Sequence, residues 1–136
     1  MKTLVEDADE TLDGRLQIPV RLYFDDLGAT NPIKDFSKTL SVIRSRDIYV
    51  TLILQNLRQL YSMYDENEAL SILSNCDHIV YLNSTDLSSV EYMANRTQRT
   101  QESIMLMDRK KEYVITSGEK AILIDKNPPY SDACLE

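Results

Sequence analysis

The sequence predicts an α/β fold, a three-layer sandwich with a mostly parallel sheet and a C-terminal β-hairpin. The first observation is that short apolar runs alternate with stretches whose apolar residues recur every three or four positions, as in strands that alternate with helices. The second is that the run over 48–54 is almost uninterrupted in apolar and β-branched residues, which is typical of a parallel strand covered on both faces. The third is a pair of apolar runs separated by Ser117-Gly118, which indicates a hairpin.

The first part of the chain contains a helix and a strand. Residues 2–16 mix a few apolar residues with many acids and include the turn signal Asp13-Gly14, so we expect a short helix there. Pro19 opens the first strand, where a missing amide donor is tolerated. That strand continues through alternating apolar residues to Asp25.

The middle of the chain repeats the alternation of helix and strand. Apolar residues on one face predict a helix over 34–46, and the run over 48–54 predicts the second strand. A helix follows from Leu57, a short helix covers 68–74, and a third strand covers 78–82. Strands connected through helices in this way form right-handed βαβ units.

The last part of the chain is expected to hold one helix and the hairpin. Asp86 can cap a helix that runs to about Arg96. The hairpin strands cover 112–116 and 120–124. The basic stretch over 96–111 is expected to be a solvated connector, and a patch that faces DNA or a partner is the alternative.

Size and charge exclude several classes of protein. At 136 residues the chain is expected to form one domain, and its net charge of −7 argues against a nucleic-acid footprint over the whole surface. A local basic patch stays open.

No apolar run approaches the roughly 18 residues of a membrane span, and no signal peptide is visible, so we expect a soluble, cytoplasmic chain. One histidine and two distant cysteines do not suit a zinc site, and Cys76 is expected to be a buried thiol.

Polar residues follow each of the three predicted strands. Asp25 and Asp26 end the first, Gln55 follows the second and Asn83 follows the third. Because ligands in open α/β sheets sit outside the carboxyl ends of the strands, these residues are the candidate site. Asp25 can hold a water-bound Mg²⁺, and Asp26 can orient or activate the water that attacks a nucleotide phosphate, which is the Walker B pattern.

A purely structural role, without catalysis or ligand binding, stays open for each candidate residue. The two acids can be solvated residues at a strand end, and Gln55 can be a hydrogen-bonding residue of the same kind. Arg44 and Arg46, near a helix C-terminus, can simply complement the helix dipole.

An ordered set of motifs resembles one known family. The motifs are an acidic strand end, a basic helix end, a strand ending in Gln, a Gln-Leu-x-x-x-Tyr helix, an Asn-Cys-Asp strand entry and a Tyr-Leu-x-x-x-Asp strand exit. Here they are Asp25-Asp26, Arg44-Ser45-Arg46, Gln55, Gln59-Leu60 with Tyr64, Asn75-Cys76-Asp77, and Tyr81-Leu82 with Asp86. Over roughly residues 15–125 the chain resembles the C-terminal half of the motor domain of type IV secretion coupling proteins, the TraG/TraD family of conjugative DNA-transfer ATPases.

The resemblance implies a fold and a setting. The fold is RecA-like, of the P-loop NTPase class, and residues 1–136 form a partial motor domain that holds the Walker B half. In the complete protein it implies ATP and Mg²⁺ as cofactors and a homo-hexamer at the cytoplasmic face of the cell membrane. The implied partners are the missing half of the same motor domain, the relaxase and relaxosome accessory protein, DNA, and components of the secretion channel.

The resemblance also implies roles for single residues. Asp25 acts on Mg²⁺ through water, and Asp26 takes the place of the catalytic base, where many members carry Glu. Gln55 takes the place of a polar sensor that contacts the γ-phosphate or the attacking water. Arg44 matches an arginine that reaches the nucleotide of the neighbouring subunit, and Arg46 is the runner-up for that position.

The phosphate-binding loop of such motors does not occur in these residues. No G-x-x-x-x-G-K-[ST] is present, and the sequence has only three glycines. Without that loop there is no backbone cradle or lysine for the phosphates, so we expect the chain alone to hold no nucleotide and to be inactive. Two alternatives stay open: a docking module that recognises relaxosome or secretion partners without nucleotide chemistry, and another RecA-like DNA translocase.

Overall fold

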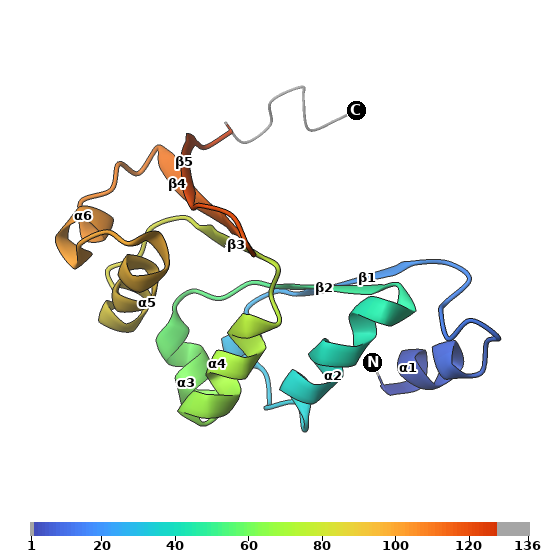
Figure 1. The fold of residues 1–136 in the computed structure, drawn as a ribbon. Coiled ribbons are helices and arrows are strands. Elements are labelled where there is room, and N and C mark those ends of the chain that lie inside the picture. The colour runs from blue at the N-terminus through green and yellow to red at the C-terminus, as the bar shows by residue number, and fades with distance from the viewer. Residues whose placement is uncertain (1, 128–136) are drawn as a thin grey trace. The chain divides into compact units, whose positions relative to one another are not determined.

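The computed structural model describes residues 2–127, which form two compact units that meet in sequence at Asn75 and Cys76 (Figure 1). Helices and strands follow one another almost as the sequence predicts. Residues 128–136, which include Cys134, lie outside the described residues. No helix within the described part has the length and apolar character that crossing a bilayer requires.

The first unit is built around one parallel strand pair. Strands β1 and β2 pair in register, with Val20 opposite Ile48 and Phe24 opposite Leu52, which confirms the predicted parallel βαβ unit. The elements of this unit are α1 (Lys2–Asp9), β1 (Val20–Phe24), the 3-10 turn η1 (Leu27–Ala29), α2 (Phe36–Ile43), the 3-10 turn η2 (Arg44–Arg46), β2 (Ile48–Leu52), α3 (Leu57–Met63) and α4 (Glu66–Ser74).

Helices cover one face of this strand pair. Figure 1 shows α2, α3 and α4 on the same side of β1 and β2. On that side the ring of Phe24 meets the edge of Phe36 at 5.9 Å, and Phe36 stacks on Tyr64 at 6.2 Å. Tyr23 and Tyr49, on the other face of the strands, are 66% and 47% exposed. Within the described part of the first unit the arrangement is therefore two-layered, and the third layer of the predicted sandwich is not seen there.

The second unit holds a separate antiparallel sheet. Its elements are β3 (His78–Tyr81), α5 (Leu87–Thr97), α6 (Gln101–Met105), β4 (Lys111–Thr116) and β5 (Ile122–Asp125), and the strand order is β3-β4-β5. The predicted hairpin is confirmed as β4 and β5. The expected extension of the parallel sheet by the third strand is not seen among the described residues, where β3 pairs antiparallel with β4. The sheets are thus one parallel pair and one antiparallel trio, and not a mostly parallel sheet.

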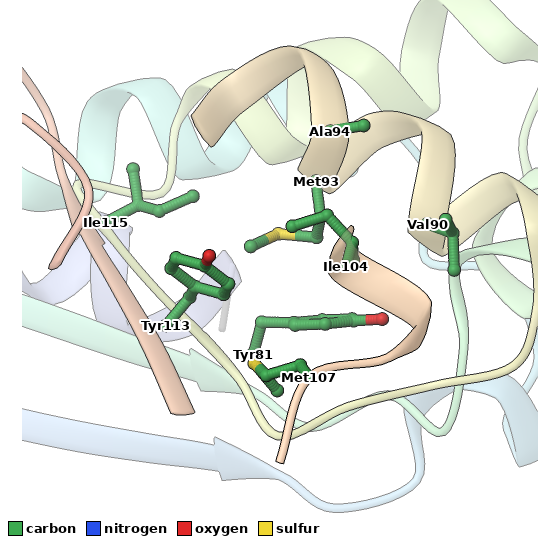
Figure 2. Packing of buried hydrophobic residues seen from close by; sticks show 8 residues of the cluster. All are labelled: Tyr81, Val90, Met93, Ala94, Ile104, Met107, Tyr113 and Ile115. Atoms are coloured by element: carbon green, nitrogen blue, oxygen red, sulfur yellow. The ribbon is translucent and has the colours of Figure 1, made fainter. Parts of the chain in front are cut away.

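The pairing of β3 with β4 completes a core of its own. Tyr81 lies opposite Tyr113 in the register, and both are buried. Figure 2 shows this core, to which β3, β4, α5, α6 and the segment after α6 contribute Tyr81, Val90, Met93, Ala94, Ile104, Met107, Tyr113 and Ile115. Burial of these apolar side chains stabilises this unit.

Capping residues define the two helices of this unit. The Asp86 carboxylate accepts a hydrogen bond from the Ser89 amide at 2.9 Å, which confirms the predicted cap of α5. Helix α6 lies in the stretch that was expected to be a connector. Its N-cap is Thr100, whose hydroxyl accepts from the Ser103 amide at 3.2 Å.

Candidate functional site

The candidate site lies where β1 and β2 end. Backbone pairing continues past both strands: the Ile53 amide donates to the Phe24 carbonyl at 2.9 Å, and the Leu27 amide donates to the Ile53 carbonyl at 3.2 Å. The two acids, Asp25 and Asp26, lie between these two hydrogen bonds. They are therefore held at the carboxyl end of the parallel pair, beside the residues that follow β2.

Asp26 is held directly against Gln55. The Gln55 side-chain amide donates to Asp26 Oδ2 at 3.2 Å. The backbone of Asp26 is left-handed, with φ 50° and ψ 55°, a conformation that Asp tolerates better than most residues. The structure thus brings together two of the four strand-end residues that the sequence predicts.

The second oxygen of this carboxylate is buried and unpaired. Asp26 Oδ1 has no hydrogen-bond partner among the described residues. A buried oxygen without a partner typically costs about 1–3 kcal/mol, so such atoms point to a group that the chain itself does not supply. A water, a cation or a donor from another segment would satisfy it.

Asp25 and Asp26 fit a hydrated Mg²⁺. Asp25 is exposed, and within residues 2–127 its carboxylate has no hydrogen bond or ion pair. Mg²⁺ keeps several waters and is commonly bound through one or two carboxylates plus substrate phosphates. The described residues contain no group of three or more His, Cys, Asp or Glu that could hold a metal ion.

Gly28 and Gln59, which sequence reasoning assigned no role, set the position of Gln55. The Gln55 backbone amide donates to Gln59 Oε1 at 3.2 Å, and the Gln59 amide donates to Asn56, the cap of α3, at 3.1 Å. A Cβ at Gly28 would lie 2.5 Å from Gln59 Cδ, so η1 and α3 approach too closely for any side chain there. The signal was present in the sequence: a glycine two residues after the acids and a glutamine four residues after Gln55.

Arg44 does not join this cluster. It is exposed on η2, which precedes β2, whereas Gln55 follows β2. Since a strand rises about 3.3 Å per residue, the five residues of β2 separate the two positions by roughly 16 Å. Arg44 therefore lies at the opposite end of the strand pair from Asp26 and Gln55.

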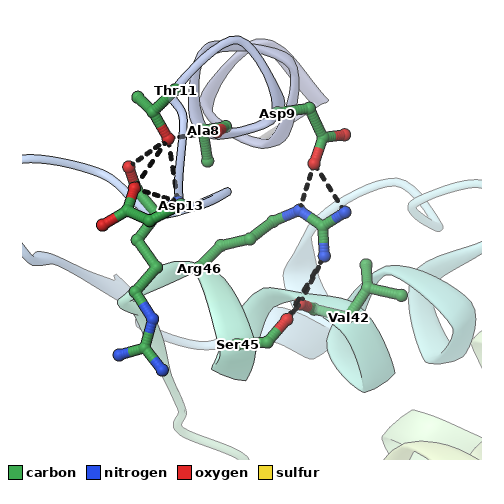
Figure 3. Close-up of polar contacts among 8 residues, drawn as sticks. Ala8, Asp9, Thr11, Asp13, Val42, Ser45 and Arg46 are labelled. Carbon is green, nitrogen blue, oxygen red and sulfur yellow. Dashed lines mark hydrogen bonds and ion pairs between the residues drawn. The ribbon is translucent and has the colours of Figure 1, made fainter.

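Arg46, the runner-up, is tied into a local network. Its Nε donates to Asp9 Oδ1 at 2.8 Å, and Nη2 lies 2.6 Å from the same oxygen. Nη1 donates to the Val42 carbonyl at 3.0 Å and to the Ser45 hydroxyl at 3.3 Å (Figure 3). Arg46 thus links α1 to η2, and Arg44 is the more accessible arginine of the two.

Asn83 belongs to the second unit. Its backbone has φ 92°, and its side-chain amide donates to the Met107 carbonyl at 3.1 Å. This hydrogen bond fixes the segment that follows β3 within that unit. That Asn83 shares a site with Asp26 and Gln55 stays a prediction.

Cys76 does not have the character of a reactive thiol. Burial, with a smaller contribution from the Asp77 charge, raises the pKa of the Cys76 thiol. The thiol is therefore protonated at neutral pH, and a protonated thiol is a poor nucleophile. This agrees with the structural role expected from the sequence, although the residue is only partly buried.

Comparison with known proteins gives a family and a fold. A family model described as the TraM recognition site of TraD and TraG matches residues 19–112. The unbound monoclinic form of the bacterial conjugative coupling protein TrwBdeltaN70 matches with a TM-score of 0.69 and 17% identity, covering 82% of this chain and 32% of that one. The plasmid coupling protein TrwB in complex with ADP and Mg²⁺ matches with a TM-score of 0.71 and 16% identity, covering 89% and 33%.

The structural matches have low sequence identity and cover only part of the known proteins. At 16–17% identity the likeness to TrwB shows the fold alone. The chain spans about a third of the length of those structures. No curated protein sequence matches the chain significantly.

Proposed function

Because the chain belongs to the family described as the TraM recognition site of TraD and TraG, we propose that it is the Walker B side of the RecA-like motor domain of a conjugative coupling ATPase. The complete protein would link the DNA–relaxase complex to a type IV secretion channel and pump DNA with ATP. The observation that carries this proposal is the hydrogen bond between Asp26 and Gln55 at the end of a parallel strand pair, beside a buried carboxylate oxygen without a partner. The family match favours this parent over other RecA-like DNA translocases.

The geometry gives each strand-end residue a task. Gln55 holds Oδ2 of Asp26, and a small local opening would let the buried Oδ1 accept a hydrogen bond from the attacking water. The exposed carboxylate of Asp25 would hold Mg²⁺ through water, and the cation would neutralise charge on the phosphates. Gln55, fixed by Asp26 and by Gln59, would place its amide against the γ-phosphate or the water. TrwB has been solved with ADP and Mg²⁺, which supports the same cofactors here.

Arg44 would act on the nucleotide of a neighbouring subunit. It is exposed, and it lies at the end of the strand pair remote from Asp26. An arginine so placed cannot reach the site of its own strand pair without a large rearrangement. A homo-hexameric ring, in which one subunit's arginine meets the next subunit's phosphates, would give it a function.

The remaining half of the motor would complete the sheet and the site. The apolar run of β2 is typical of a central strand, yet among the described residues β2 pairs with β1 alone. We therefore propose that a P-loop segment elsewhere in the complete protein supplies a strand to the second edge of β2. Its loop would supply the backbone amides and lysine that hold the phosphates.

A second role, recognition of a relaxosome accessory protein, has its own support. The family model is described by recognition of TraM and covers residues of both units. Recognition of this kind needs no nucleotide chemistry. The isolated chain would then be a docking module, and the complete protein would combine docking with DNA transport at the cytoplasmic face of the membrane.

Calorimetric titration separates the two roles. The purified chain is titrated with Mg²⁺ and a non-hydrolysable ATP analogue, and again after the P-loop half has been restored. We expect binding only with the P-loop half present. Micromolar binding by the chain alone would overturn the incomplete-site proposal. Binding of a TraM-type accessory protein to the isolated chain tests the docking role independently of nucleotide.

A further inference from the structure

A hollow of about 410 Å³ opens in the second unit where β3 ends. Its apolar part consists of Leu82, Met105, Leu106 and Met107. Three of these are well exposed: Leu106 at 76%, Leu82 at 55% and Met105 at 44%. Single exposed apolar residues are ordinary, but exposed apolar residues grouped in a hollow of about 300–1,000 Å³ are typical of binding sites.

Two cations, Arg109 and Lys126, line the same hollow. The Lys126 ammonium donates to the Leu82 carbonyl at 2.7 Å, which holds its charge beside the apolar part. None of the described residues that line the hollow is acidic, although the whole chain has 22 acids against 15 Lys and Arg. The described lining therefore carries two cations and no acid, although Asp86, Asp108 and Asp125 stand next to lining residues in the chain and the net charge is −7.

The wall of the hollow is held in place before any ligand binds. The Asn83 side chain donates to the Met107 carbonyl at 3.1 Å, and Met107 itself is buried in the core of the unit. The Ser84 amide donates to the Tyr81 hydroxyl at 3.0 Å, and that hydroxyl donates in turn to the Ser84 carbonyl at 3.2 Å. A preformed wall lowers the entropy lost on binding.

We propose that this hollow binds a short segment of a partner protein in which apolar side chains stand next to carboxylates. The apolar side chains would lie against Leu82 and Leu106, and the carboxylates would pair with Arg109 and Lys126. The described lining contains no aromatic residue, and stacking on single-stranded nucleic acid depends on aromatic side chains, so the chemistry favours an acidic peptide. The inference rests on the docking role proposed above, for which it names the surface and the chemistry of the ligand.

Peptide binding tests the inference directly. The 136-residue chain is titrated, by fluorescence anisotropy, into a labelled octapeptide of alternating leucine and glutamate and into its counterpart with glutamine at each glutamate. We expect the glutamate peptide to bind about tenfold more tightly, since charge-assisted contacts are the stronger ones. Arg109→Gln and Lys126→Gln should each weaken that binding by about threefold, and Leu106→Gln should weaken binding of both peptides.

Arg96→Gln is the matched control. Arg96 is exposed in the last turn of α5, outside the hollow, so its replacement removes the same charge without touching the site. Circular dichroism of each variant would verify that it folds. Equal binding of the two peptides, or binding that Arg109→Gln and Lys126→Gln leave unchanged, would overturn the inference. Binding of an oligothymidylate would also overturn the inference if Arg109→Gln and Lys126→Gln weakened it more than they weaken binding of the peptide.

Two further outcomes separate this inference from the docking role. If an accessory protein binds the chain equally well with and without Arg109→Gln and Lys126→Gln, docking stands and the hollow is not its site. If the glutamate peptide binds as described but the accessory protein does not, the hollow stands and docking of that protein is refuted. Sedimentation shows whether a second copy occupies the hollow: self-association that Leu106→Gln abolishes would contradict a separate partner.

Discussion

Gly28→Ala tests the close approach that positions the candidate site. Gly28 is not among the residues with positive φ, so alanine can adopt its backbone conformation. At such a position a Gly-to-Ala change normally stabilises a protein by about 0.4–1 kcal/mol. Here the new Cβ would lie 2.5 Å from Gln59 Cδ and 2.7 Å from Gln59 Cβ. The second atom is fixed by the backbone of α3, so rotating the Gln59 side chain cannot relieve the contact.

We therefore expect Gly28→Ala to destabilise the chain, whereas a Gly-to-Ala change at such a position normally stabilises a protein. Overpacking of this kind costs about 1–3 kcal/mol, which corresponds to a fall in Tm of roughly 4–12 °C for a chain of this size. Urea unfolding followed by circular dichroism would measure the free energy of unfolding. Ala29→Ser, at the exposed neighbouring residue of η1, is the control and should change stability by less than about 0.5 kcal/mol. A Gly28→Ala chain that is as stable as the wild type, or more stable, would refute the reasoning.

Three further predictions concern the described contacts. Asp9→Asn removes the ion pair with the partly exposed Arg46, and should lower stability by about 0.5–1 kcal/mol, with the difference vanishing in high salt on denaturant titration. Tyr64→Phe leaves the Ile33 amide, now 2.9 Å from the hydroxyl, without its acceptor and should cost about 1–3 kcal/mol by the same assay. Burial raises the pKa of Cys76, so the rate of alkylation of that thiol should rise with pH at a higher midpoint than in the unfolded chain. The measurement uses a chain whose other cysteine is replaced by serine. Equal midpoints in the folded and unfolded chains would contradict this expectation.

Local patterns predicted the elements of the first unit. Apolar residues on one face over 34–46 identified α2 with η2, because a helix places every third or fourth residue on the same side. The apolar run from Ile48 identified β2, and the intervening helix required it to run parallel to β1. The hydrogen bond between Asp26 and Gln55 follows from that pairing, since it brings the two strand ends to one edge.

Long-range choices could not be predicted in the same way. The residues of β3 are apolar enough to suit a parallel or an antiparallel neighbour, and no local pattern shows that Tyr81 lies opposite Tyr113 of β4. Helix α6 has only five residues, too few for a periodic signal, although Thr100 was available as its cap. The spacing of Gly28 and Gln59 from the candidate residues can be read in the sequence, but their close approach is an interatomic distance, which no sequence pattern contains.

The most direct test of the central claim is the ATPase activity of the complete coupling protein that carries Asp26→Asn. Asparagine tolerates the left-handed backbone of Asp26, so the change removes the charge and leaves the conformation. Asp35→Asn is the matched control, because Asp35 has φ 54°, is exposed and makes no side-chain cap hydrogen bond. We predict that Asp26→Asn lowers turnover by a factor of about 100 or more, as expected for loss of a catalytic base, and that Asp35→Asn leaves it unchanged. Wild-type turnover in the Asp26→Asn protein would contradict the account.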